Sequence, residues 1–301
     1  MASTPADIAA PQARRPSPRT GHRSRGRGGT AAIRAVSHSA LAAYSLIVLL
    51  PLLFIIYLSV KDLPGIVGTP LSVPHSIQTR NYTQAWADGS LGRFLLNTVI
   101  VAVVSVAGIL LFSTLAAFVI ARYRFTGRQL LYLFFISGMA LPVQIIALPV
   151  FILVKDIHLL NSLASLVLVY AAAGISFSVF LLVNFMRGIP DELQEAAVID
   201  GAGPARICWH IVLPLVRPAF AIVAIFQFLA VWKEFLLPLI LVQDPAKMTV
   251  GVGILSFVGE YGTQWDLLLA ALAIVSIPSI VGFLLVARQF RRGLMSGGVK
   301  M

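Results

Sequence analysis

The sequence predicts an all-α fold, that of a polytopic membrane protein with six transmembrane helices. Of its 301 residues, 58% are hydrophobic and only 12% are charged, whereas a soluble domain carries about 25% charged residues. The mean hydropathy is +0.89. The apolar residues gather in runs that can each cross a bilayer, which takes about 20 residues. These six runs are residues 40–60, 95–120, 130–154, 163–185, 219–241 and 267–287.

Five prolines lie inside these runs. A proline in a transmembrane helix frees a backbone carbonyl, which neighbouring helices can satisfy. We therefore expect kinks at these positions, and kinks suit helices that must rearrange. The five are Pro51, Pro142, Pro149, Pro238 and Pro278.

The basic residues predict the orientation of the chain. Residues 1–39 are rich in Pro, Gly and Ser and in arginine, a composition that predicts a disordered basic tail. This tail either lies on anionic lipid headgroups or serves only as a topology signal. If the runs alternate in direction, most Lys and Arg residues fall on the side of this tail, which the positive-inside rule assigns to the cytoplasm. Both termini are therefore predicted to be cytoplasmic, and residues 40–301 form one multi-pass membrane domain.

Several functional classes are excluded by residues that the sequence lacks. The single cysteine, Cys208, allows neither an internal disulfide nor a cysteine-based metal site. No P-loop, Gly-x-Ser-x-Gly elbow or Rossmann fingerprint occurs, so we predict no catalytic residue, no bound metal and no cofactor. The net charge of +11 does not indicate nucleic-acid binding, because the basic residues flank apolar runs. Any energy for active transport must come from another polypeptide.

The polar stretch at about residues 187–217 separates the fourth and fifth runs. Carboxylates at its start favour the positive end of a helix, and Pro190 suits a first helical position. Gly201 can supply the left-handed residue that ends such a helix. Gly203-Pro204 then restarts the chain in a new direction. We predict two short helices with a sharp corner at Asp200-Gly201, whose small side chains would let another protein approach closely.

The same stretch resembles the EAA loop of permease subunits of binding-protein-dependent ABC importers. The resemblance rests on Glu195-Ala196-Ala197, then Gly201 after three residues, then Ile211-x-Leu213-Pro214. In that family the loop is the cytoplasmic coupling helix, which docks into a groove of the ATPase subunit. An ordinary polar loop is the alternative. By this resemblance, force from the ATPase is transmitted by Glu195, Ala196, Ala197, Asp200 and Gly201. Cys208 departs from the large aromatic residue that the family usually has there.

Other segments resemble the carbohydrate-importing branch of this family, and within it the smaller maltose permease component. They are Asn81-Tyr82 with residues 94–98, residues 121–128, residues 232–238 and residues 293–300. The resemblance therefore covers the chain from the first run to the C-terminus and implies the plasma membrane of a prokaryote. Lys233 departs from the asparagine that the family usually has.

Lys233 and Glu234 are the ionisable residues deep in a predicted span. Charges there are costly and mark functional sites by default, although Lys233 could instead extend its stem to the interface. Trp232 could stack on a sugar ring or belong to the interfacial aromatic belt. Together with Asn97 of the matched second span, these residues form the candidate translocation path: Asn97, Trp232, Lys233 and Glu234.

The resemblance implies a subunit that translocates a sugar or oligosaccharide delivered by an external solute-binding protein. It also implies a second permease subunit, forming a heterodimer, and two ATPase subunits that bind ATP and Mg²⁺. The same machinery could instead carry a polyol, a glycerophosphodiester or a polyamine. A different class, the ion-coupled secondary transporter, would show broken helices in paired halves and more intramembrane carboxylates.

Overall fold

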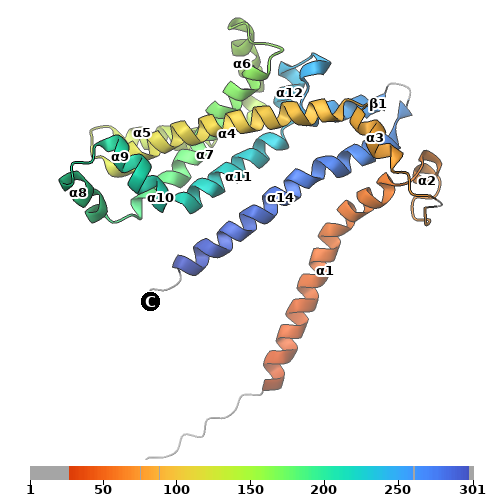
Figure 1. Ribbon diagram of the computed structural model, residues 1–301, viewed down its shortest axis with the longest axis horizontal. Helices are drawn as coiled ribbons and strands as arrows, with labels where there is room; N and C mark the ends of the chain where they lie inside the picture. Colours follow the sequence, from red (N-terminus) through yellow and green to blue (C-terminus); the bar gives the residue numbers. More distant parts are fainter. Residues whose placement is uncertain (1–26, 75, 88, 260–261, 298–301) are drawn as a thin grey trace, which may run out of the picture. The chain divides into compact units, whose positions relative to one another are not determined.

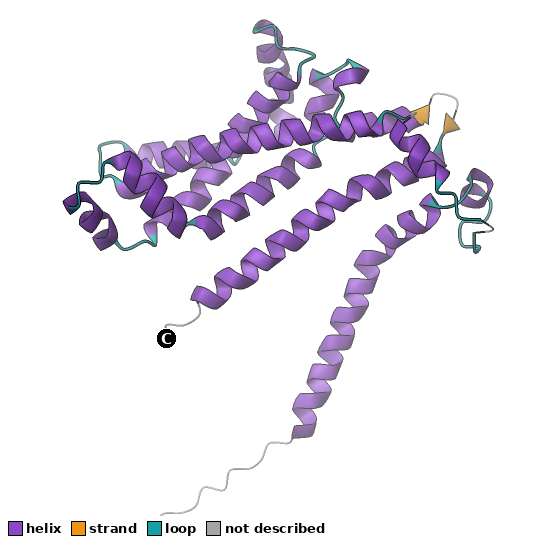
Figure 2. Ribbon diagram, viewed as in Figure 1, coloured by secondary structure: helices purple, strands orange, loops and turns teal. Residues whose placement is uncertain are grey.

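A computed structural model describes residues 27–297 except residues 75, 88, 260 and 261. Helices make up nearly all of its regular structure, which confirms the all-α prediction (Figure 2). The chain divides into two units, residues 1–51 and 52–301, and helix α1 (Arg27–Ser59) continues across their boundary. Helix α1 begins inside the predicted tail, at Arg27. Residues 1–26 lie outside the described residues.

Four predicted spans are confirmed as long apolar helices. The first lies within α1 as Val36–Ser59, and the last begins helix α14 (Trp265–Gly297) as Trp265–Leu285. The second and fourth are α4 (Leu91–Arg122) and α7 (Leu163–Arg187). Pro51 and Pro278 lie inside continuous helices, so these two prolines do not interrupt their spans.

The predicted third span is broken. Helices α5 (Arg128–Gly138) and α6 (Val143–Asp156) meet at an angle of 99°. The break precedes Pro142, whose ring disfavours helical backbone at the preceding residue. Pro149, by contrast, is accommodated inside α6.

The predicted fifth span is also interrupted. Helix α11 (Arg217–Trp232) ends before Lys233, and α12 (Leu236–Leu241) begins after Phe235. Pro238 explains this break, because its ring would clash with the carbonyl of Glu234 in a continuous helix. The segment Pro204–Leu215 and α11 form a second bent pair, at 81°. Among the described residues there are thus four helices able to cross a membrane, or up to six if each bent pair is one span.

Short elements complete the described chain. The strands β1 and β2 pair antiparallel, with Val258 opposite Thr263. The remaining elements are α2 (Leu63–Val67), α3 (Arg80–Ala87), α8 (Asp191–Ile199), α9 (Pro204–Ile207), the π-helix η1 (Cys208–Val212), α10 (Leu213–Leu215), η2 (Pro245–Lys247), α13 (Val250–Gly253), η3 (Ile254–Phe257), β1 (Val258–Gly259) and β2 (Gly262–Thr263).

The packing of unit 2 centres on α4 and α7, which lie side by side and both contact α11 (Figure 1). Gly174 permits this closeness, since a Cβ there would clash with Ile109. One buried cluster joins the ends of α4 and α7 to the segment after α8, through residues such as Ala117, Val183 and Val212. The α8–α10 region is therefore part of the packed core at that end of the helices.

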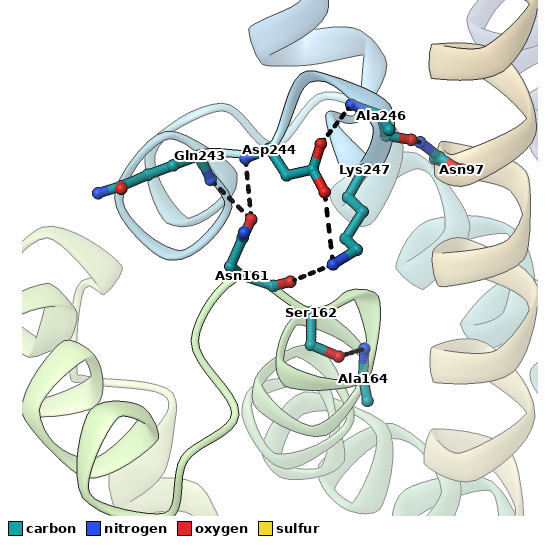
Figure 3. Close-up of polar contacts among 8 residues, drawn as sticks. All are labelled: Asn97, Asn161, Ser162, Ala164, Gln243, Asp244, Ala246 and Lys247. Carbon is teal, nitrogen blue, oxygen red and sulfur yellow. Dashed lines mark hydrogen bonds and ion pairs between the residues drawn. The ribbon is translucent and has the colours of Figure 1, made fainter.

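The loop between α12 and α13 is held in place by two asparagines (Figure 3). The Asn161 Oδ1 atom accepts hydrogen bonds from the backbone N–H groups of Gln243, at 3.2 Å, and Asp244, at 2.8 Å. The Lys247 ammonium donates to the Asn161 carbonyl at 3.0 Å. From α4, the Asn97 amide donates to the carbonyls of Ala246 and Met248. This loop is thus fixed to both α4 and the start of α7.

Helix α13, which follows this loop, contacts α4 and the break after α11. The Val250 N–H donates to the Thr98 hydroxyl at 2.8 Å. Gly251 lies directly against the backbone carbonyl of Glu234, and a Cβ at this position would clash with it. The Ala246 N–H and the Lys247 ammonium lower the pKa of Asp244, the residue that caps η2. The carboxylate therefore stays charged at neutral pH.

We expect Asn161→Leu to release this loop. It removes the acceptor of two backbone N–H groups, each bond stabilising the loop by about 1 kcal/mol, and it places a bulky side chain at φ +57°. Hydrogen exchange at Gln243 and Asp244 should accelerate about tenfold or more, while Asn161→Asp should retain most of the protection. Asn184→Ala is the control, because that amide bonds only within its own helix. Unchanged exchange in Asn161→Leu would contradict this role.

Candidate functional site

Helix α8 forms where the carboxylate-rich start of the polar stretch predicts it. Asp191 and Glu192 occupy its first turn, where they favour the positive helix end. Pro190 is the residue before the helix rather than its first residue, one position from the prediction. The helix ends at Ile199, so the prediction of a short helix before the corner is confirmed.

The predicted corner at Asp200-Gly201 is confirmed. Gly201 has a left-handed backbone with φ +79°. Its N–H donates to the Val198 carbonyl at 3.0 Å, and the Ala202 N–H donates to the Ala197 carbonyl at 2.9 Å. This pair of bonds is a Schellman motif, which satisfies carbonyls that the helix end would leave free. A Cβ on Gly201 would meet no atom within 4 Å, so glycine is needed here for its conformation and not for space.

The second helix of the loop departs from a regular α-helix. It starts at Pro204 as predicted, but residues Cys208–Val212 form a π-helix. Pro214 explains the widening, because its ring would clash with the His210 carbonyl in an α-helix. Cys208, which stands in place of a large aromatic, is buried at 2% exposure. The small thiol fits into the packed end of α4 and α7.

Helix α8 leaves an apolar face uncovered. Ile199 is 85% exposed and Val198 is 57% exposed. Leu193 is half-exposed and lines a hollow of about 570 Å³ between the end of α7, α8 and α10. Exposed apolar side chains bordered by polar ones indicate an interaction surface. We call Val198 and Ile199, which are adjacent at the end of α8, the α8 apolar face.

The five residues that the resemblance assigns to coupling do not share one environment. Glu195, Ala196, Asp200 and Gly201 are exposed beside the α8 apolar face. Ala197 is buried and packs in the cluster with the ends of α4 and α7. Four of them are therefore accessible at the surface, whereas Ala197 packs the helix against its own chain.

Arg122, the last residue of α4, connects this helix to α8. Its side chain is 2% exposed and lies 3.2 Å from the Asp191 carboxylate. The guanidinium donates to the carbonyl of Ile189 at 2.9 Å and to the Gln194 side chain at 2.8 Å. It also donates to the carbonyls of Met186 and Pro190. One side chain thus joins the end of α4, the end of α7 and the first two turns of α8.

The sequence did not reveal this junction. Arg122 belongs to the segment of residues 121–128 that resembles the family, but as a basic residue after an apolar run it predicted only orientation. Nothing in the sequence indicated that Arg122 is buried. The carbonyls that accept its hydrogen bonds belong to the backbone, and a backbone carbonyl is present in every residue type.

The four candidate path residues lie in different environments. Trp232 is buried at 3% exposure, stacks on Phe228 and donates to the Val275 carbonyl of α14 at 3.2 Å. Its ring therefore joins α11 to α14 and is available neither to a solute nor to an interfacial belt. Asn97 is buried and holds the loop before α13. Both residues serve packing in this structure.

Lys233 and Glu234 are separated by the break after α11. Lys233 is exposed and is not among the residues that line the cavity described below. The Glu234 Oε1 atom accepts hydrogen bonds from the backbone N–H groups of Leu236, at 3.0 Å, and Leu237, at 3.4 Å. Glu234 thus caps the start of α12. Both residues therefore lie at a break in the predicted fifth span, where Pro238 led us to expect a kink.

Glu234 also lines a cavity of about 720 Å³ between the α5–α6 bend, α7 and α11. Most of its lining is apolar. Its aromatic wall consists of Phe177 and Phe226, which stack with ring centroids 5.1 Å apart. Tyr170 and Gln227 add polar groups. Of the candidate path residues, Glu234 is the one that the structure places at this cavity.

Comparison with known proteins identifies relatives over most of the chain. Residues 109–295 match the family model described as binding-protein-dependent transport system inner membrane component. The chain is 34% identical over 265 residues to the diacetylchitobiose uptake system permease protein NgcG of Streptomyces coelicolor, covering 87% of this chain and 88% of the relative. It is 31% identical to AmyC of Thermoanaerobacterium thermosulfurigenes, a probable starch degradation products transport system permease protein, covering 85% of this chain and 93% of the relative.

A solved structure shares the fold. A chain of a bacterial ABC transporter involved in the import of the acidic polysaccharide alginate matches with a TM-score of 0.77 and 21% identity, covering 87% of this chain and 98% of that chain. A second structure shows the alginate transporter in complex with its pentasaccharide-bound periplasmic protein, with a TM-score of 0.62 and 17% identity, covering 88% of this chain and 96% of that one.

Proposed function

Because the chain belongs to the family of binding-protein-dependent transport system inner membrane components, we propose that it translocates a sugar or an oligosaccharide as the membrane-spanning subunit of an ATP-driven importer. It is a permease and not an enzyme, and ATP hydrolysis belongs to a separate subunit. The relatives named for diacetylchitobiose and for starch degradation products support a saccharide as the solute.

The observation that carries this proposal is the pairing of an exposed apolar face with a buried anchor. The α8 apolar face presents Val198 and Ile199 to a partner, and Arg122 holds the start of the same helix on α4 and α7. A displacement of α8 by the ATPase would therefore move two membrane-spanning helices together. Coupling of this kind requires an apolar docking face and a rigid connection, and α8 has both.

The proposed assembly contains further subunits. An external solute-binding protein delivers the solute, in keeping with the complex seen for the alginate transporter. A second, different permease subunit would complete the pathway as a heterodimer. Two ATPase subunits would bind ATP and Mg²⁺, because the sequence of this chain has no P-loop. In each half of the assembly, one ATPase would receive one coupling helix.

We propose that both termini and α8 face the cytoplasm, as the distribution of basic residues indicates. Cys208 is buried, so the unaltered chain should react poorly with maleimides from either side. Ile199→Cys in a Cys208→Ala background places a thiol at an exposed position. A membrane-impermeant maleimide should label it in inverted vesicles and not in intact cells. Labelling in intact cells would reverse the proposed orientation.

Uptake by cells tests the proposed function. A strain lacking this chain is compared with the complemented strain for uptake of maltose, melibiose, raffinose, N,N′-diacetylchitobiose, digalacturonate, a glycerophosphodiester and spermidine. Uptake of at least one saccharide should require the chain and its ATPase. Loss of only spermidine or glycerophosphodiester uptake would replace the saccharide assignment, and uptake that survives ATP depletion would contradict an ATP-driven importer.

A further inference from the structure

We infer that this subunit itself binds the saccharide, in the cavity beside the α5–α6 bend, and that the cavity selects uncharged saccharides over acidic ones. The inference rests on the proposed function and extends it to a site and a charge class. Three polar side chains would make the contacts: Tyr170, Gln227 and Glu234.

The dimensions and walls of the cavity suit a small saccharide. A volume of about 720 Å³ lies within the range of small-molecule sites, which are mostly apolar clefts of roughly 300–1,000 Å³ with a few placed polar groups. Phe177 and Phe226 supply an aromatic wall against which the apolar face of a sugar ring can pack. Residues on both sides of the 99° bend between α5 and α6 also line the cavity.

Tyr170 carries an unexplained polar group. Its side chain lines the cavity and is 7% exposed, yet its hydroxyl has no hydrogen-bond partner among the described residues. Leaving a buried hydroxyl unpaired costs about 1–3 kcal/mol. A solute hydroxyl in the cavity would satisfy it, as donor or as acceptor.

Hydrogen bonds hold Gln227 and Glu234 in place, and each side chain keeps one oxygen atom that can accept a further hydrogen bond. The Gln227 amide nitrogen donates to the Gly174 carbonyl at 2.9 Å and to the Ser178 hydroxyl at 3.1 Å. Both of its N–H groups are thereby used, and its Oε1 atom remains as an acceptor. Glu234 directs Oε1 to the start of α12, so Oε2 remains. Two fixed acceptors beside one hydroxyl match the many hydroxyl donors of a sugar.

The charge of the side chains that line the cavity determines its preference for uncharged saccharides. Among the described residues that line the cavity, Glu234 is the carboxylate, and no Lys, Arg or His side chain is present. Lys233 is adjacent in sequence but lies outside this lining. An acidic saccharide would bring a second negative charge into an apolar cavity without a cation to pair with it, which is strongly unfavourable. Such a repulsive element excludes solutes as effectively as contacts select them.

Direct binding to the purified importer in lipid nanodiscs, without the solute-binding protein, tests the site. The probes are the tritiated saccharide that the uptake panel identifies and tritiated digalacturonate. The unaltered importer should bind the uncharged saccharide and not digalacturonate. Tyr170→Phe and Glu234→Gln should each weaken the binding of the uncharged saccharide about tenfold. Glu234→Gln should also reduce the discrimination against digalacturonate.

Two matched variants control for general damage. Lys233→Gln changes the charge next to Glu234 without touching the cavity lining, and Ser113→Ala removes another buried, unpartnered hydroxyl that lies elsewhere. Neither should change binding. Stimulation of the ATPase by the loaded solute-binding protein confirms that each variant is assembled. A Tyr170→Phe or Glu234→Gln importer that is stimulated and binds as tightly as the unaltered one overturns the inference.

The proposed function and this inference fail in different ways. If digalacturonate is the solute transported by the unaltered importer, the charge preference is wrong while the importer assignment stands. If the loaded binding protein does not stimulate the ATPase of the unaltered importer, the proposed function itself is wrong.

Discussion

Arg122→Met is expected to reduce uptake at least a hundredfold while the importer still reaches the membrane. The substitution removes a side chain that is 2% exposed and leaves the carbonyls of Met186, Ile189 and Pro190 without their donor. Unpaired buried polar groups cost about 1–3 kcal/mol each, so α8 should separate from the end of α4. The ATPase would then turn over without moving the membrane helices.

Basal ATPase activity distinguishes this loss of coupling from misfolding. It should persist in Arg122→Met, whereas stimulation by the loaded binding protein should disappear. Arg122→Lys should restore little uptake, because the lysine ammonium lacks the planar fork with which the guanidinium reaches five acceptors. Arg124→Met is the control, since Arg124 is exposed two residues further along. Normal uptake in Arg122→Met would show that α4 is not driven through this residue.

Gly201→Val is expected to have the second-largest effect. Gly201 has φ +79°, and an L-residue in left-handed backbone costs about 1–2 kcal/mol, with a β-branched side chain costing more. The least costly way to relieve this strain is to break the two hydrogen bonds of the Schellman motif. Breaking them would displace the α8 apolar face. Uptake should fall about tenfold or more at equal membrane abundance, with stimulated ATPase activity falling in parallel.

Neighbouring variants isolate the conformational cause of this effect. Gly201→Asn should retain most uptake, because asparagine tolerates left-handed backbone. Gly203→Val is the matched control: its φ is −71° and no atom lies within 4 Å of its Cβ position. If Gly201→Val and Gly203→Val lower uptake equally, the backbone conformation at the corner is not the cause.

Local features of the loop could be predicted from the sequence because they depend on adjacent residues. Gly201 and Pro204 determine backbone geometry by their own chemistry, whatever surrounds them. The corner and the start of the second helix therefore appeared where expected. The π-helix did not, since a proline such as Pro214 permits either a kink or a widening of the preceding turn.

The broken spans could be predicted only in part. Five prolines predicted kinks, yet the chain breaks beside Pro142 and Pro238 and continues through Pro149. The outcome depends on whether neighbouring helices satisfy the freed carbonyls, which residue order does not show. Broken helices were also expected of a secondary transporter, so the breaks alone do not separate the two classes; the family match does.

The environments of the candidate path residues could also be predicted only in part. Trp232 and Glu234 are close in the sequence, but one is sealed against α14 and the other borders the cavity. Burial by distant helices determines this difference. Tyr170 and Gln227 gave no signal in the sequence, because polar residues in an apolar run can equally well bond to their own helix.

The contact between Gly251 and the Glu234 carbonyl joins α13 to a residue that lines the cavity. Helix α13 follows directly on the loop that Asn97 and Asn161 fix, and it rests on the backbone of the residue that caps α12. Because no side chain lies between them, a shift of the loop by a fraction of an ångström must be taken up by Glu234. We therefore expect any displacement of the α12–α13 loop to reach the cavity lining through this single backbone contact at Glu234.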